Sequence, residues 1–234
     1  MNRLTSIVFG AALMSSALVA SAAEIAGNVT LATDYRFRGI SQVNGGFSPA
    51  IQGGFDLATD AGFYIGTWSS NIKGTEGAIE TDIYGGFKGM FSDDLGYDIG
   101  VLYYGYPQDG AAHDGYTEVY GSLSWKGAKF GVNYSDNYFA GSGEFLYPYV
   151  DFGFDPMENV TLSFHYGYNS FDEKQAGLNN EDYYQDWKAA ISTKQLGVNW
   201  ALAYVDTDLD NNRDCYGNKQ LCEATAVFSI SKSL

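Results

Sequence analysis

Hydrophobic residues alternate with small or polar residues along most of this sequence. In the segment 160–168, which reads VTLSFHYGY, every even position is apolar or aromatic and every odd position is small or polar. The same alternation occurs over 29–37, 95–103, 117–125 and 196–204. Successive side chains of a β-strand point to opposite faces, so each segment predicts a strand with one apolar and one polar face. A chain built almost entirely of such segments is an all-β protein.

The alternation predicts about twelve strands, with ten or fourteen as the alternatives. Each predicted strand is close to the length with which a tilted strand crosses a bilayer. No Pro-rich or Ser-rich linker separates them, so we expect one domain over residues 24–234. The predicted strands are 25–40, 48–58, 61–71, 78–90, 95–106, 116–126, 128–138, 144–154, 158–168, 183–193, 195–205 and 223–234.

The links between these strands alternate in length. Short turns at one end and long loops at the other are typical of an outer-membrane barrel, whereas nothing sorts the loops of a soluble β-sandwich, which is the alternative fold. We therefore predict an antiparallel transmembrane β-barrel. The short links are Thr59–Asp60, Ser92–Asp94, Gly127, Asp155–Met157 and Lys194, and the long ones are 41–47, 72–77, 107–115, 139–143, 169–182 and 206–222.

The first 23 residues have the features of a secretory signal peptide. Arg3 is their only charged residue, an apolar run covers 7–19, and Ala20 and Ala22 form an A-x-A cleavage pattern. The alternative, a membrane anchor helix, would need a longer apolar run. We therefore expect Sec-type export and location in the outer membrane of a Gram-negative bacterium.

Charge and composition narrow the class of partner. Without the first 23 residues the chain has 12 Lys and Arg against 28 Asp and Glu, a net charge of −16, which argues against nucleic-acid binding. The 19 Tyr, 15 Phe and 29 Gly with only 4 Pro suit long sheets with closely packed faces. Aromatic residues near strand ends, such as Phe164, Tyr166 and Tyr168, predict contact with outer-membrane lipid and lipopolysaccharide.

The final strand runs to the last residue. Ala226, Phe228, Ile230, Lys232 and Leu234 alternate with smaller residues there. Substrates of the outer-membrane barrel assembly machinery end in this way, although most end in Phe, so we expect that machinery to be a partner during biogenesis.

The polar faces of the predicted strands carry eight acidic and six basic residues. An unpaired charge in a confined space is costly, so we expect these charges to pair. Arg36 and Arg38 either anchor the inward acids or form a paired-arginine constriction that binds anions; anchoring is favoured because eight acids need partners. The predicted lumen-lining residues are Asp34, Arg36, Arg38, Asp56, Glu80, Asp82, Lys88, Asp98, Glu118, Lys126, Lys129, Asp151, Asp186 and Lys188.

Cys215 and Cys222 are the only cysteines of the chain. Because both follow the predicted signal peptide, they are expected in an oxidising compartment and to form a disulfide. The chain-entropy model gives about 2.5 kcal/mol for so short a ring. A metal site is the alternative, but it lacks a nearby histidine.

No residue pattern predicts catalysis, a cofactor or a metal site. Ser163 and His165 share the inward face, but a hydrolase also needs an orienting partner, so we interpret His165 as a polar lining residue. The acidic segment 206–214 resembles the start of a calcium loop. Asn211 and Gly217 stand where a full loop has Gly and Glu, which leaves weak binding open.

Several strings of this sequence resemble one bacterial family. Residues 28–42, NVTLATDYRFRGISQ, followed by QGGFDL at 52–57, are similar to the opening of the TorF porin family, which is also catalogued as a proteobacterial conserved hypothetical family. The resemblance implies an outer-membrane channel, supplies no substrate or catalytic residue, and fits the Cys215–Cys222 loop. Further matching strings are GFYIGTWSSNI at 62–72, YDIGVLYYGYP at 97–107, EVYGSLSW at 118–125, GVNWALAYVDTD at 197–208 and VFSISKS at 227–233.

The number of strands sets the expected width of the lumen. Eight strands leave an interior filled by side chains, whereas sixteen or more leave an open channel. Twelve strands with inward charges therefore predict a narrow pore for passive diffusion of ions or small solutes, with a slight cation preference. The alternatives are a closed barrel with a structural or surface-interaction role and, less favoured, an outer-membrane enzyme acting on lipid.

Overall fold

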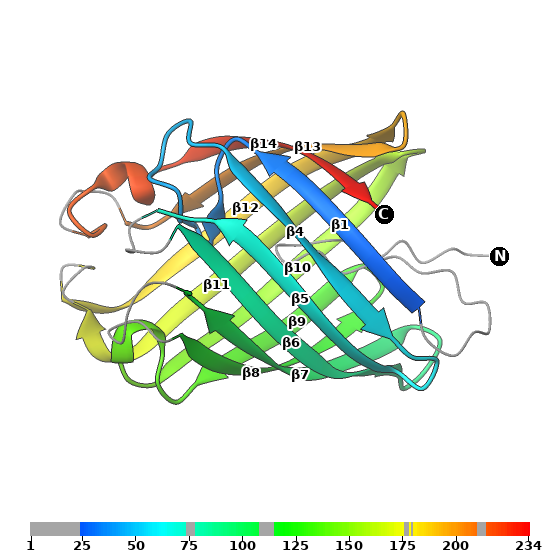
Figure 1. Ribbon diagram of the computed structural model, residues 1–234, viewed down its shortest axis with the longest axis horizontal. Helices are drawn as coiled ribbons and strands as arrows, with labels where there is room; N and C mark the ends of the chain where they lie inside the picture. The colour runs from blue at the N-terminus through cyan, green and yellow to red at the C-terminus, as the bar shows by residue number, and fades with distance from the viewer. Residues whose placement is uncertain (1–23, 74–77, 108–114, 176–177, 179, 210–213) are drawn as a thin grey trace.

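The chain forms a closed antiparallel β-barrel of twelve strands, which confirms the predicted fold class (Figure 1). The computed structural model describes residues 24–73, 78–107, 115–175, 178, 180–209 and 214–234, so the predicted signal peptide lies outside the described residues. The barrel strands are β1 (Glu24–Ala32), β4 (Ala50–Ala58), β5 (Phe63–Asn71), β6 (Ile79–Met90), β7 (Leu95–Gly105), β8 (Tyr116–Trp125), β9 (Ala128–Ser135), β10 (Phe145–Met157), β11 (Val160–Gln175), β12 (Glu181–Gln195), β13 (Val198–Thr207) and β14 (Thr225–Ser233).

Closure depends on the first and last barrel strands. β1 pairs with β4 on one side and with β14 on the other, where Asn28 lies opposite Ser233 and Ala32 opposite Ser229. The other strands each pair with their sequence neighbours. The barrel therefore has no open edge, and all its backbone ladders are complete.

The strand predicted over 25–40 is wrong beyond Ala32. There the chain leaves the wall and forms the two-residue strands β2 (Arg36–Phe37) and β3 (Ile40–Ser41), which pair with each other. Arg38 and Gly39 between them have φ angles of 47° and 80°, a left-handed conformation that a continuous strand cannot contain. Alternation in sequence continues through this segment, but the backbone does not follow it.

Three predicted links also differ from the structure. Asp155–Met157 belongs to β10 and Lys194 to β12, and the turns lie instead at Glu158–Asn159 and Leu196–Gly197. Asn159, Leu196 and Gly197 have positive φ angles, which such tight turns require. The long loop predicted over 169–182 is much shorter, because β11 continues to Gln175.

The two ends of the barrel differ. The short links between β4 and β5, β6 and β7, β8 and β9, β10 and β11, and β12 and β13 lie at one end, together with the start of β1 and the C-terminus (Figure 1, right). The longer links lie at the opposite end, which we call the long-loop end. The short 3-10 helices η2 (Phe139–Gly141) and η4 (Lys219–Leu221) belong to it.

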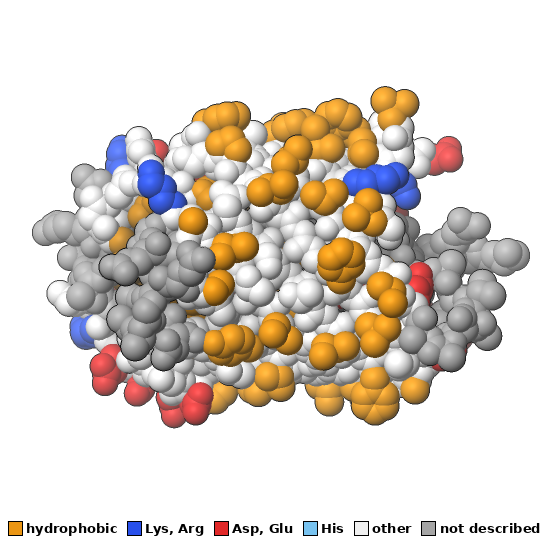
Figure 2. Space-filling view, viewed as in Figure 1, with side chains coloured by type: hydrophobic (Ala, Val, Ile, Leu, Met, Phe, Trp, Pro, Cys, Tyr) orange, Lys and Arg blue, Asp and Glu red, His pale blue; other side chains and the backbone are white. Residues whose placement is uncertain are grey.

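The outer surface is largely apolar. Hydrophobic side chains are scattered over the middle of the visible face, among uncharged side chains and backbone, and the charged side chains lie toward its two ends (Figure 2). Ile25, Phe55, Phe63 and Phe130 are all more than half exposed. Acidic side chains such as Asp56, by contrast, are buried inside. The fold is thus inverted relative to a water-soluble protein, with apolar side chains outside and charged ones inside.

Within the described part of the chain, no helix is both long and apolar enough to span a membrane.

Glycines on the inner face make room for tyrosine rings. A Cβ added at any of these glycines would overlap a tyrosine from a nearby strand. The rings therefore lie along the wall, over the glycines, instead of projecting across the bore. The pairs are Gly66 with Tyr84, Gly86 with Tyr64, Gly100 with Tyr120, Gly131 with Tyr149, and Gly167 with Tyr147.

Two other strand glycines differ in how closely the backbone of a neighbouring strand approaches them. A Cβ at Gly54 would overlap the backbone carbonyl of Thr67, whereas one at Gly121 would come no closer than 3.8 Å to Ile99. We expect Gly54→Ala to lower the free energy of unfolding by about 1–3 kcal/mol, the usual effect of overpacking. Gly121→Ala should change it little. Urea unfolding in detergent micelles, followed by tryptophan fluorescence, measures both variants, and equal stabilities would contradict the close approach of the Thr67 backbone to Gly54.

Candidate functional site

The segment 33–49 between β1 and β4 folds into the barrel at the long-loop end; we call it the inward loop. Tyr35 Oη donates a hydrogen bond to Glu80 of β6 at 2.7 Å. On another side, Tyr184 Oη of β12 donates to the Arg38 carbonyl at 3.1 Å. A Cβ at Gly39 would overlap Thr207 of β13. The loop therefore crosses the lumen and touches walls far apart around the barrel.

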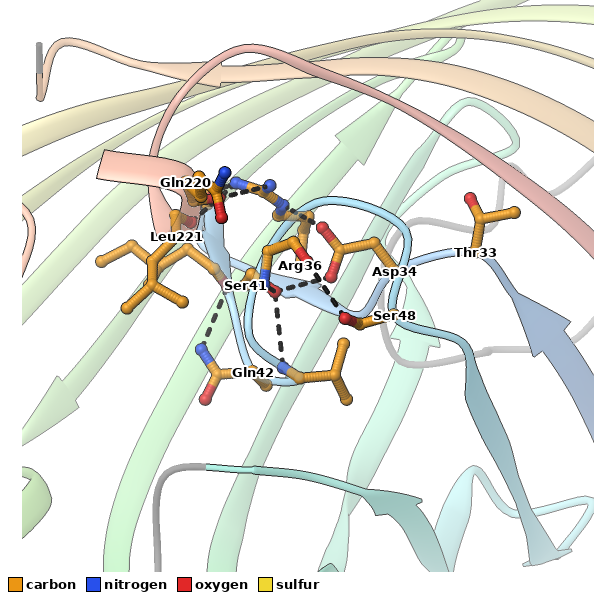
Figure 3. A network of polar contacts seen from close by, with 12 residues as sticks. Thr33, Asp34, Arg36, Ser41, Gln42, Ser48, Gln220 and Leu221 are labelled. Carbon is orange, nitrogen blue, oxygen red and sulfur yellow. Dashed lines mark hydrogen bonds and ion pairs between the residues drawn. The ribbon is translucent and has the colours of Figure 1, made fainter. Parts of the chain in front are cut away.

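The inward loop has its own polar core (Figure 3). Asp34 accepts hydrogen bonds from Arg36 Nε and Ser41 Oγ, both at 2.6 Å. Ser41 Oγ in turn accepts from the backbone N–H of Gly45 at 2.8 Å. Asp34, which is 3% exposed, thus fixes both arms of the loop.

Arg36 anchors the inward loop to the segment before β14. Its Nη1 donates to the carbonyl of Leu221 at 2.7 Å and its Nη2 to that of Gln220 at 3.2 Å (Figure 3). The disulfide between Cys215 and Cys222, both fully buried, closes this segment. The predicted disulfide therefore has a structural role, since it holds the acceptors of the Arg36 guanidinium.

Arg38 enters a cage on the other side of the lumen. Its Nη1 and Nη2 donate to Oε1 and Oε2 of Glu118, each at 2.8 Å. Glu118 is fully buried, and Asn133 and Tyr104 donate to its Oε2 at 2.9 and 3.2 Å. The guanidinium carbon also lies over four aromatic rings, with centroid distances of 4.3 Å for Tyr147, 4.7 Å for Phe37 and Phe145, and 5.8 Å for Tyr138.

We call this arrangement the Arg38 cage: the carboxylate of Glu118 and the surrounding rings. The two arginines point to different partners, so they do not form the paired constriction considered from the sequence. Arg38 is bound as a guanidinium is bound in a recognition site, through a bidentate ion pair and aromatic faces.

Acidic residues on β4, β6 and β7 form what we call the acidic wall: Asp56, Glu80, Asp82 and Asp98. Their hydrogen-bond donors are mainly tyrosines, with Tyr84 Oη donating to Asp56 at 2.5 Å and Tyr64 Oη to Asp98 at 2.6 Å. Asp82 is 6% exposed, and its Oδ1 has no hydrogen-bond partner among the described residues. An ionised carboxylate without a donor is costly to bury, so a cation or a proton at this place in the acidic wall would be stabilising.

His165 is held between two carboxylates on the other half of the barrel. Its Nδ1 lies 2.6 Å from Asp151 Oδ1, and its Nε2 lies 3.2 Å from Asp186 Oδ1 and 2.7 Å from Tyr147 Oη. Lys188 lies opposite His165 in the β11–β12 register. Both imidazole nitrogens are thus engaged by acidic and phenolic groups, which makes His165 part of a polar lining network.

The predicted lumen-lining residues fall into three groups. Asp34, Arg36 and Arg38 lie inside the barrel, but on the inward loop and not on a strand. Lys126 lies in the turn after β8, is exposed, and pairs with Asp94 at 3.5 Å, so its inward assignment is wrong. The others lie on the lumen faces of barrel strands: Asp56, Glu80, Asp82, Lys88, Asp98, Glu118, Lys129, Asp151, Asp186 and Lys188.

Sequence reasoning missed the uncharged partners of these groups. Tyr104, Asn133, Tyr147 and Asn169 orient the carboxylates of Glu118 and Asp186. Each lies on the same strand face as the charged residues, so the alternation of inward and outward positions already placed them in the lumen. The alternation alone did not show which acid on a nearby strand each of them donates to.

The acidic segment proposed as a calcium loop is only partly described, since residues 210–213 lie outside the described chain. Asp208 accepts hydrogen bonds from the backbone and side chain of Gln185. Among the residues that the structure describes, no group of three or more His, Cys, Asp or Glu could hold a metal ion.

Comparison with known proteins finds one family that matches the sequence and solved structures with a similar fold. The sequence model of a family described as "Bacterial protein of unknown function (Gcw_chp)" matches residues 16–234. The NanC porin is similar in structure, with a TM-score of 0.55 and 13% identity over 88% of this chain and 97% of that one. The KdgM porin has a TM-score of 0.54 and 8% identity over 89% and 97%. None of the curated protein sequences matches the chain.

The disulfide should control how firmly the inward loop is held. In a Cys215→Ser/Cys222→Ser variant the carbonyls that accept from Arg36 lose their fixed positions, so we expect faster trypsin cleavage after Arg36 and Arg38. Mass spectrometry of digests of the folded barrel measures the rate. Cleavage after Lys126, in an exposed turn at the opposite end, is the internal control and should not change. An unchanged rate in the inward loop would show that the disulfide does not hold it.

Proposed function

We propose that this chain, which belongs to the Gcw_chp family of bacterial proteins of unknown function, is an outer-membrane porin for passive diffusion of ions or small solutes. The observation that carries the proposal is the closed twelve-stranded barrel with an apolar outer face and a charged lumen. A barrel of this kind satisfies every backbone ladder internally while its side chains meet lipid outside and water inside. The similarity of residues 28–42 to the TorF porin family supports the same function.

The proposed location is the outer membrane of a Gram-negative bacterium, reached by Sec-type export and the barrel assembly machinery. The apolar outer band would contact lipid, and the long-loop end would face lipopolysaccharide and the medium. Short turns and both chain ends of the barrel would then lie in the periplasm, as is usual for such barrels. Lys232 on the outer face of β14 donates to the Gly197 carbonyl near this end, which suits an interfacial position.

The lumen favours cations. Among the described residues, eight Asp and Glu face the interior against five Lys and Arg: Asp34, Asp56, Glu80, Asp82, Asp98, Glu118, Asp151 and Asp186 against Arg36, Arg38, Lys88, Lys129 and Lys188. A KdgM porin has been solved in complex with oligogalacturonate, a polyanion. The net negative lumen of this chain supports a preference of the opposite sign.

The inward loop favours a second candidate function. It crosses the lumen and is held by the Arg36 and Arg38 contacts, which would suit a closed barrel acting through its surface loops. An enzyme acting on lipid is less well supported, because His165 is engaged by Asp151 and Asp186 inside the barrel and not on the lipid-facing surface.

Planar bilayer recording tests the proposal. The folded protein should give small conductance steps, and its reversal potential in a potassium chloride gradient should show a cation preference. In an Asp56→Asn/Asp98→Asn variant this preference should fall, because two carboxylates of the acidic wall that accept from tyrosine hydroxyls become neutral. Asp94→Asn, which changes an exposed turn, is the matched control. Folded protein, identified by heat-modifiable gel migration, that gave no steps would favour the closed barrel.

A further inference from the structure

We infer that the Arg38 cage is a binding site for small solutes that carry a guanidinium group, and that Arg38 itself occupies it as a tethered competitor. The inference rests on the proposed porin function and names the solute class that its lumen would recognise. It follows from three features of the cage: its bidentate geometry, the origin of its walls, and the charge around it.

The carboxylate of Glu118 is arranged for a planar two-point donor. Its two oxygens accept separately from the two terminal nitrogens of Arg38, both at 2.8 Å. A guanidinium presents two parallel N–H groups that match a carboxylate in this way, whereas an ammonium group offers a single point charge. The aromatic faces around the guanidinium carbon add attraction for a flat, weakly hydrated cation.

The walls of the cage belong mainly to the barrel. Glu118 lies on β8, Tyr104 on β7 and Asn133 on β9, and Phe145 and Tyr147 lie on β10. Apart from Arg38 itself, only Phe37 comes from the inward loop. A site built on paired strands keeps its geometry when the loop leaves, so the cage is preformed and the loop is its removable occupant.

Charge around the cage also favours an incoming cation. Arg38 pairs with Glu118, while Glu80 receives a hydrogen bond from Tyr35 and the Oδ1 of Asp82 has no partner among the described residues. The ring of Tyr35 packs on Trp68, and the ring of Phe37 packs on Tyr104. Trp68 and Tyr104 lie on either side of Asp82 in the strand register. Withdrawal of the loop would thus uncover two further carboxyl groups, Glu80 and Asp82, for an incoming cation.

The turn that carries Arg38 is suited to leave the cage while Arg36 keeps the rest of the loop attached. Arg38 has a φ of 47°, which is unfavourable for a residue with a side chain. Its carbonyl accepts a hydrogen bond from Tyr184, and its side chain makes the contacts in the cage. A guanidinium-bearing solute in the lumen would compete for the same carboxylate and release the turn that carries Arg38.

Chemical rescue tests the site. Arg38→Ala empties the cage while keeping the contacts that Arg36 makes, so we expect more conductance than in the wild type. Guanidinium chloride at roughly 10 mM should then lower this conductance at least about twofold, as expected for a millimolar bidentate ion pair. Methylammonium chloride at the same concentration is the matched cation and should have much less effect. In Arg38→Ala/Glu118→Gln the guanidinium effect should disappear.

Two outcomes would overturn the inference. One is an equal effect of guanidinium and methylammonium on Arg38→Ala channels; the other is persistence of the guanidinium effect in the double variant. If no variant conducts, the porin proposal fails by itself. The cage is then tested by the melting temperature of Arg38→Ala, which guanidinium should raise more than methylammonium does. Guanidinium should leave the melting temperature of the double variant unchanged.

Discussion

The pairing of β1 with β14 is the contact on which the rest of this structure depends. An open twelve-stranded sheet would have two edges with unpaired N–H and C=O groups, which cannot be left in an apolar medium. Closure removes both edges and gives the sheet an inside and an outside. Each alternate side chain is then assigned to one environment, and the inward glycines and tyrosines pack as one continuous lining.

A second constraint acts within that enclosure. Eight carboxylates share a confined space, and the chain supplies cations to them unevenly. Glu118 receives Arg38, and Asp151 and Asp186 receive His165, while the acidic wall depends on tyrosine hydroxyls. A buried ion pair adds little stability relative to apolar packing, but it fixes one arrangement because leaving either partner alone is costly. The Arg38–Glu118 pair therefore specifies where the inward loop lies more than how stable the barrel is.

The disulfide and the ion pair hold the same loop from different sides. Arg36 contacts carbonyls in the disulfide-closed segment, and Arg38 contacts the strand β8. Two arginines two residues apart in sequence thus act on separate parts of the barrel. This division explains why they form neither a joint constriction nor an anion site, and it leaves the loop attached at one side when Arg38 is displaced.

Much of this fold could be predicted from the sequence, because alternate side chains of a barrel strand face an apolar and a polar environment and their residue types differ accordingly. The approximate positions of the strands from 50 to 233, the sorting of short and long links, and the burial of Asp56, Asp82 and Asp186 follow from that alternation, although the ends of β10, β11 and β12 do not. The strand predicted over 25–40 was wrong beyond Ala32, because Asp34, Arg36 and Arg38 keep the same alternation on a loop. On a loop, alternate residues do not have to point to opposite faces. Lys126 was misplaced for the same reason, at a turn.

The sequence by itself determined which residues are polar, how they alternate, and therefore the barrel and its charged interior. Only the tertiary structure decided that Arg38 reaches Glu118, 80 residues away in sequence, and that Arg36 reaches Leu221 instead of an acid across the lumen. Alternation carries information about the face on which a side chain lies. It carries none about which of several acids on that face an arginine meets, because barrel closure and the path of the inward loop set those distances.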